Sequence, residues 1–378
     1  MKKQKKTTYS LLLLACALAF LFFLEGNKLQ FGMAYTVIQK GIILAVVAVS
    51  MNLVTGFTGL FSLGQAGFMA IGAYVTALFL IPTDEIEGVF YITDISSTIL
   101  SVKQWLDSLP AFLQPLIPII ALIIGGLVAS LFAALIGIPV LRLKSDYLAI
   151  ATLGFSEIVR ALISSPQMDS ITNGSYGLKR IQGFSSIVQT FVIAAICILL
   201  MVLLIRSSYG RAFKAIREDE IAAEAMGINL FRHKQLSFVI GSFFSAVSGG
   251  MLAMFMRSID SKTFSIALTY DILLIVVIGG IGSVTGSVIA ALLVTMSKEW
   301  WLRFFDEPLV IGSFEVPLFR TGFRMVVFSI LLMLVVLFYQ RGIMGKREFS
   351  WEGIVRAFLK LKNKLIKTPK KGGVDHAE

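Results

Sequence analysis

Apolar blocks long enough to cross a lipid bilayer recur along the chain, and they constrain its fold more than any other feature. A helix needs about 20 apolar residues to cross a hydrocarbon layer roughly 30 Å thick. Of the 378 residues, 56% are hydrophobic and only 15% are charged, with a mean hydropathy of +0.83. A soluble domain carries about 25% charged residues. The pattern therefore predicts an all-α polytopic membrane protein rather than a soluble domain with a large core.

Ten membrane spans are predicted, all within a single transmembrane domain at residues 9–340. A basic N-terminal segment (1–8) precedes this domain and a basic tail (341–378) follows it. A glycine-dense break at 279–286 leaves open whether 266–301 forms two spans or a re-entrant hairpin. The spans cover about 9–24, 33–54, 57–81, 112–140, 147–164, 187–205, 236–256, 266–281, 287–301 and 323–339.

The placement of the basic residues predicts the orientation of the chain. With the N-terminus inside, alternation of the spans puts 22 of the 34 Lys/Arg in inside segments and 8 in outside loops. Cytoplasmic flanks carry such an excess, so both termini are expected in the cytoplasm. The net charge of +11 therefore indicates contact with a lipid bilayer and not with nucleic acid. The tail at 341–378 is either an amphipathic helix on anionic lipid or a solvated extension.

Side chains for hydrolytic or redox chemistry are scarce. The only two histidines, His233 and His376, lie in predicted cytoplasmic segments, and the two cysteines, Cys16 and Cys197, lie in apolar runs. No G-x-x-x-x-G-K-[ST] phosphate loop occurs in the sequence. We expect no enzyme activity, no cofactor and no metal in this chain. If ATP drives it, another subunit binds the nucleotide.

A charged segment at residues 206–234 interrupts the apolar pattern. It contains six Lys/Arg and four Asp/Glu, and it is predicted to face the cytoplasm. Its small and apolar residues predict a short amphipathic helix that stops at Gly227. Such a helix can dock into a groove of a cytoplasmic partner, lie on the membrane surface, or serve as a plain connector. The apolar side comprises Ala212, Phe213, Ala215, Ile216, Ala222, Ala223 and Met226.

Polar residues within the spans are the other candidates for function, because ionisable groups are costly in a membrane. Glu157 and Arg160 are three residues apart, so they either face a polar path or neutralise each other on one helix face. Uncharged polar residues around spans 33–54 and 57–81 either bond helices together or line a path. Glycines in 57–81 predict that a neighbouring helix approaches closely.

Several sequence blocks resemble, in the same order, those of the LivM-type permeases of bacterial branched-chain amino acid ABC importers. The resemblance covers most of residues 45–347. The chain departs from the family pattern, which often has His at the position of Gln65, Gly at the position of Asn173, an acidic residue near Tyr176 and Pro in the region of 340–341. The matching blocks include MNLVTGFTGLFSLGQAGFMAIGAY, LRLKSDYLAIATLGFSEIVR, TNGSYGL, EDEIAAEAMGI, IGGIGSVTGSVIAA and RGIMGKRE.

The resemblance implies a permease subunit in the bacterial inner membrane that moves leucine, isoleucine or valine inward. Its implied partners are a LivH-type permease, two ATPase subunits and an extracytoplasmic solute-binding protein. Alternatives are a urea or short-amide permease of the same family, or an ion-coupled carrier that needs no ATPase. The resemblance to the coupling loop of ABC permeases nominates Arg217, Glu218, Asp219, Glu220, Ala223, Glu224 and Gly227 as ATPase contacts. Candidates for the translocation path are Asn52, Ser62, Gln65, Tyr74, Glu157 and Arg160.

Overall fold

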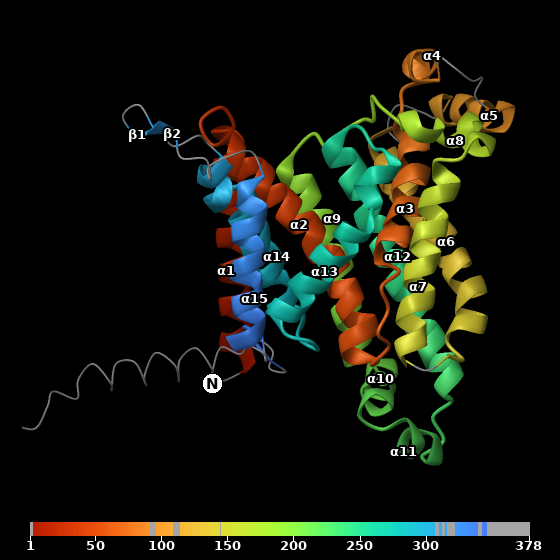
Figure 1. Ribbon diagram of the computed structural model, residues 1–378, viewed down its shortest axis with the longest axis vertical. Coiled ribbons are helices and arrows are strands. Elements are labelled where there is room, and N and C mark those ends of the chain that lie inside the picture. The colour runs from red at the N-terminus through yellow and green to blue at the C-terminus, as the bar shows by residue number, and fades with distance from the viewer. Residues whose placement is uncertain are drawn as a thin grey trace, which may run out of the picture.

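The chain folds into a bundle of roughly upright helices (Figure 1). The computed structural model describes residues 3–90, 96–108, 114–143, 145–306, 310–311, 314–315, 322–338 and 342–345. Within these residues the only strands are the short antiparallel pair β1 (Val310–Ile311) and β2 (Phe314–Glu315). The long helices are α1 (Lys3–Gly26), α2 (Gly32–Asn52), α3 (Gln65–Leu80), α6 (Ile117–Val140), α7 (Ser145–Ile163), α9 (Ile187–Arg206), α12 (Leu230–Met256), α13 (Ile266–Gly279), α14 (Val284–Glu299) and α15 (Phe323–Phe338).

Short helices mark the two ends of the bundle. Figure 1 shows α4 (Ile86–Val89), α5 (Ser97–Asp107) and α8 (Asp169–Thr172) at one end. At the opposite end lie α10 (Ser208–Glu218) and α11 (Glu220–Ala225), together with the start of α1. We call these the outer end and the inner end, following the predicted orientation.

The helices confirm a polytopic all-α fold. Four helical stretches in the described residues are long and apolar enough to cross a membrane: Gly32–Phe57, Gln114–Val140, Ile187–Arg206 and Leu230–Met256. Two bent pairs raise the number to six if each pair is one span. They are Gln65–Leu80 with Thr83–Val89, bent by 99°, and Asp146–Ile163 with Pro166–Thr172, bent by 64°. The count of ten spans stays a prediction, and the tail at 346–378 lies outside the described residues.

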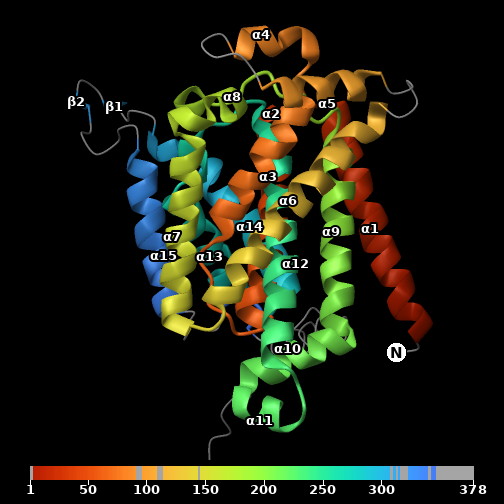
Figure 2. The same ribbon diagram turned by 90° about the vertical axis from the view of Figure 1, so that its right-hand side faces the viewer.

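Helix α3 lies at the centre of the bundle, against α12, α6 and α7 (Figure 2). The α3 and α12 backbones touch: a Cβ at Gly72 would lie 2.1 Å from the Ala246 carbonyl oxygen, and one at Gly249 would lie 2.0 Å from the Met69 oxygen. The close approach predicted from the glycines of 57–81 is therefore confirmed at Gly72. Such contact increases van der Waals packing where no hydrophobic effect drives helix association.

The helix expected from Phe57 begins only at Gln65. A π-helical turn, η1 (Leu53–Phe57), ends α2, and residues 58–64 are then non-helical, with Gly59 at a φ of 80°. Helix α7 satisfies backbone donors there: Leu63 N donates to Thr152 Oγ1 at 2.9 Å and Gly67 N to Ser156 Oγ at 3.2 Å. Irregular backbone at membrane depth is tolerated where protein supplies these partners.

We predict that Gly249→Ala destabilises the protein, whereas Gly154→Ala does not. The added methyl group at Gly249 meets a backbone oxygen, and overpacking of this kind costs about 1–3 kcal/mol. Gly154 is an exposed α7 position with nothing within 4 Å of a built Cβ. The measurement is the thermal-unfolding midpoint in detergent. A G249A midpoint equal to that of wild type would contradict the assigned helix contact.

Candidate functional site

The charged segment projects from the inner end of the bundle as two consecutive helices, α10 and α11 (Figures 1 and 2). Helix α10 is anchored by Phe213 and Ile216, which are buried. Its Arg217 reaches into the membrane domain, where Nη1 donates a hydrogen bond of 2.8 Å to the Gly56 carbonyl oxygen. The base of the charged segment is therefore fixed to the end of α2.

The expectation of a single short helix in this segment is wrong, because the chain breaks at Asp219. This residue is extended, with φ −158° and ψ 114°, and acts as the N-cap of α11. Its Oδ1 accepts hydrogen bonds from Ile221 N at 2.8 Å and Ala222 N at 3.0 Å, as an N-cap aspartate does. The predicted stop is confirmed: Gly227 has a φ of 83°, and its N–H donates to the Glu224 carbonyl at 2.9 Å.

Helix α11 presents two large apolar side chains to solvent. Ile221 is 82% exposed and Met226 is 83% exposed, whereas Ala223 is buried. Sequence reasoning assigned Met226 to the same apolar side as Ala223 and did not select Ile221. Because the break at Asp219 turns α11 away from α10, the apolar residues of the segment no longer share one face. The end of the segment thus carries two exposed apolar side chains, Ile221 and Met226, which we call the apolar tip.

The charged candidates of the segment differ in their surroundings. Glu218 forms an ion pair with Arg217, and Glu220 with Lys234 at 2.6 Å. The Glu224 side chain is exposed beside the apolar tip. Two of these acids are thus engaged in ion pairs and Glu224 is exposed, while Arg217 bonds to the membrane domain.

Helices α13 and α14 form an antiparallel hairpin whose turn (residues 280–283) is held by Asn52. The Asn52 amide Nδ2 donates to Ser283 O at 2.9 Å and to Ser287 Oγ at 2.7 Å, and Oδ1 accepts from Gly282 N at 2.7 Å. Gly56 also approaches the turn, since a Cβ built on it would lie 2.5 Å from Gly282 N. The hairpin turn and the end of α2 therefore form one buried joint.

Residues 342–345, from the closing sequence block, pack onto the same joint. Ile343 N donates to Ile278 O at 2.7 Å and Met344 N donates to Gly279 O at 3.2 Å. These bonds satisfy carbonyl groups that the C-terminus of α13 leaves free. At the open end of the hairpin, Lys298 pairs with Asp271 at 2.6 Å. The hairpin thus runs from the outer half of the bundle to the face that carries α10.

Among the other path candidates, Gln65 joins three helices through hydroxyl groups. Its Oε1 accepts from Ser245 Oγ, which lies 2.5 Å from Ser50 Oγ. Ser62 is buried, and its Oγ accepts from Gly64 N at 3.4 Å. Gln65 thus links α3 to α12 and α2, whereas the bond of Ser62 stays within the non-helical residues 58–64.

Tyr74 lies in the outer half of α3, where α13 and η6 (Ser261–Phe264) also contact α3. Its hydroxyl is buried without a hydrogen-bond partner among the described residues, as is that of Thr269 on α13. Buried hydroxyl groups normally find partners, so unpaired ones call for an explanation. Helices α3 and α13 thus each carry one such hydroxyl, and Thr55 in η1 carries a third.

Glu157 and Arg160 pair with each other on α7, as their spacing predicts, with Nε 2.8 Å from Oε2. Both side chains are partly exposed. They lie on the same helix as Thr152 and Ser156, which bond to residues around the α3 N-terminus. The pair thus flanks the polar face that α7 turns to α3.

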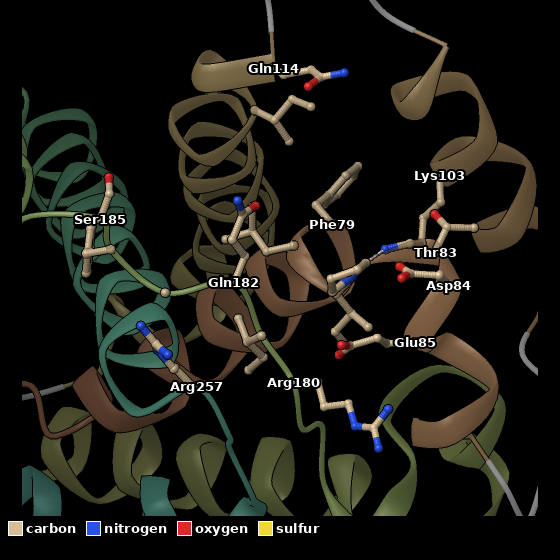
Figure 3. A pocket seen from close by; sticks show the side chains of 17 residues that line it. Phe79, Thr83, Asp84, Glu85, Lys103, Gln114, Arg180, Gln182, Ser185 and Arg257 are labelled. Atoms are coloured by element: carbon tan, nitrogen blue, oxygen red, sulfur yellow. Dashed lines mark hydrogen bonds between the residues drawn. The ribbon is translucent and has the colours of Figure 1, made fainter. Parts of the chain in front are cut away.

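A large cavity opens at the outer end, with a volume of about 1010 Å³. Its charged lining residues carry both signs: Asp84 and Glu85 are acidic, and Lys103, Arg180 and Arg257 are basic. In Figure 3, Arg257 lies across the cavity from Asp84 and Lys103. Charges of both signs suit a zwitterionic molecule. No sequence motif marked this cavity, because its residues come from separate loops and helix ends.

The sequence was compared with protein families and with individual proteins. Residues 33–337 match the family described as branched-chain amino acid transport system / permease component. The high-affinity branched-chain amino acid transport system permease protein LivM of Escherichia coli (strain K12) is 31% identical in an alignment 307 residues long, which covers 72% of this chain and 64% of that protein. The chain thus spans about two thirds of that relative's length.

Two Salmonella typhimurium (strain LT2) proteins are also similar. The LivM permease protein is 29% identical over 348 residues, covering 82% of this chain and 72% of the relative. The LivH permease protein is 25% identical over 351 residues, covering 87% and 97%. No solved structure gives a significant match. Because the family match covers most of the sequence, this chain belongs to the branched-chain amino acid transport system permease family.

Proposed function

We propose that this chain is a permease subunit of an ABC importer in the bacterial inner membrane. It moves a branched-chain amino acid inward together with a LivH-type partner. Two separate ATPase subunits supply the energy, and an extracytoplasmic binding protein delivers the solute. The observation that carries the proposal is the exposed apolar tip of α11, Ile221 and Met226, at the end of a segment anchored in the membrane domain.

The apolar tip fits a docking role. Ile221 and Met226 are each more than 80% exposed, and burial of a large apolar side chain against a partner contributes about 1.5–3 kcal/mol. A helix that inserts such residues into a groove of another protein is a common mode of recognition. Because the sequence has no phosphate loop, ATP-driven transport by this chain depends on a separate subunit that binds ATP. We assign the tip, with the rim of Asp219, Glu220 and Glu224, to that subunit.

Arg217 is the proposed mechanical link between the ATPase and the membrane domain. It joins α10 to Gly56 at the end of α2, beside the hairpin turn that Asn52 holds. A shift of α10 therefore acts on a point where two helices are already interrupted. Helix ends and turns absorb changes of backbone angle more readily than continuous helices do. In this proposal, movement at the joint alternates access of the path to the two sides of the membrane.

We place the solute path along α3 and α7, from the outer cavity towards the non-helical residues 58–64. The outer cavity carries charges of both signs, which match an amino acid's ammonium and carboxylate groups. The unpaired hydroxyls of Tyr74 and Thr269 supply hydrogen-bond partners deeper in the bundle. The other candidates then act mainly by shaping the helices around the path. They are Asn52, Ser62, Gln65 and the Glu157–Arg160 pair.

We predict that Ile221→Asp abolishes ATP-driven uptake by weakening ATPase binding about 10- to 100-fold. Burial of an isoleucine side chain contributes about 1.5–3 kcal/mol, and each 1.4 kcal/mol is a factor of ten. Co-purification of the ATPase subunits and leucine uptake into proteoliposomes measure the effect. Ile221→Leu, which keeps the apolar surface, is the matched control and retains both properties. Normal ATPase binding by I221D would remove the basis for the proposal.

Arg217→Ala has a different expected effect. It leaves the apolar tip in place, so the ATPase subunits still bind and hydrolyse ATP, but it removes the bond to Gly56. Leucine uptake per ATP hydrolysed should fall severalfold. Arg211→Ala on the same helix is the control, because Arg211 is exposed and bonds only to Ser208 among the described residues. If R217A and R211A transport equally well, Arg217 is not the link.

A further inference from the structure

A second cavity, which we call the inner cavity, lies where α10 meets the membrane domain. Its volume is about 340 Å³, and it is formed by the end of α9, by α10, by Phe57 and by the start of α14. This volume lies in the range of about 300–1,000 Å³ that small-molecule sites occupy. The proposed transport mechanism does not use this space.

The inner cavity is lined by three cations and, among its described lining residues, by no acid. Arg206 ends α9, and Lys214 and Arg217 lie one turn apart on α10. Arg217 is already engaged by Gly56 O and by Glu218 at the rim. Lys214 lies over the Phe57 ring, with Nζ 5.6 Å from the ring centroid. Arg206 and Lys214 therefore supply positive charge that the acids of the described chain do not neutralise within the cavity.

The cavity also offers a hydroxyl group and borders an apolar helix face. Thr285 lines it from the first turn of α14. On α9, Val202 and Ile205 line the cavity, while the neighbouring Leu199 and Leu203 are 55% and 56% exposed. Exposed leucines on a helix long and apolar enough to cross a membrane are suited to contact with acyl chains. A polar group in the cavity can therefore belong to a molecule whose apolar part lies along α9.

We propose that the inner cavity binds a phosphate group, held by Arg206 and Lys214 and completed by Arg217 and Thr285. Arginine and lysine form short, charge-assisted hydrogen bonds with phosphate oxygens. The anionic phospholipid headgroup and free inorganic phosphate share this chemistry, and the exposed α9 leucines favour the lipid. A bound phosphate group would bridge α9, α10 and the hairpin turn. This inference does not depend on the solute or on the ATPase.

The test uses the purified full-length chain in detergent micelles. Phosphatidylglycerol, phosphatidylcholine or inorganic phosphate is added, and the thermal-unfolding midpoint and lipid adducts in native mass spectrometry are measured. We expect phosphatidylglycerol, but not phosphatidylcholine, to raise the midpoint and remain bound. Arg206→Gln with Lys214→Gln should weaken that binding at least tenfold. The control is Arg211→Gln with Arg232→Gln, which removes the same charge from exposed positions outside the cavity lining.

Each outcome decides the proposal. If inorganic phosphate raises the thermal-unfolding midpoint or displaces the lipid, the phosphate site is supported. The phosphate group then comes from a soluble compound and not from a lipid. Phosphatidylglycerol binding that both double variants weaken equally would overturn the proposal, since only net charge would matter. The proposal would also be overturned if neither phosphatidylglycerol nor inorganic phosphate bound the wild-type protein. If the double variant does not fold, Lys214→Gln alone against Arg211→Gln alone makes the same comparison.

Discussion

The fold depends on satisfying backbone groups where helices are interrupted inside an apolar bundle. An unpaired amide in such surroundings costs several kcal/mol, so each interruption needs a dedicated partner. Asn52 supplies it for the hairpin turn, and Thr152 and Ser156 supply it for the residues around the α3 N-terminus. These three side chains come from α2 and α7, so the interruptions and the helix packing stabilise each other. The close α3–α12 contact at Gly72 and Gly249 then fixes the centre around which they are arranged.

The interruptions also determine where an external subunit can act. Continuous helices transmit displacement as rigid rods, whereas the end of α2 and the hairpin turn can change angle. The charged segment bonds to this joint through Arg217, and its opposite extremity is the exposed tip of Ile221 and Met226. In the proposed mechanism, a force applied to the tip reaches the joint through one short helix, α10. The inner cavity adjoins this route, so a bound phosphate group would stiffen it.

Apolar runs predict the long helices well, because burial in lipid requires the same residues that the sequence displays. Helix α9 was expected at 187–205 and occupies Ile187–Arg206. The break after Phe57 was missed because its glycines were interpreted as a packing surface, although Gly59 also allows a positive φ. Asp219 was assigned to a helix despite the preference of aspartate for N-caps.

Other features depend on contacts between distant segments, which spacing along one chain does not encode. They are the exposure of Ile221, the outer cavity, and the unpaired hydroxyls of Tyr74 and Thr269. Asn173 adopts a φ of 55°, a conformation that asparagine tolerates.

Docking of a separate ATPase on the tip of the charged segment is the central claim, and site-specific photocrosslinking tests it most directly. A photoreactive amino acid would replace Met226 in the complete assembly in membranes. The same group at Tyr176, which is exposed and follows α8 of the outer end in the chain, serves as the reference. If the ATPase docks on the tip, position 226 crosslinks to an ATPase subunit and position 176 does not. Crosslinks from position 226 only to lipid, or equal ATPase crosslinking from both positions, would contradict it.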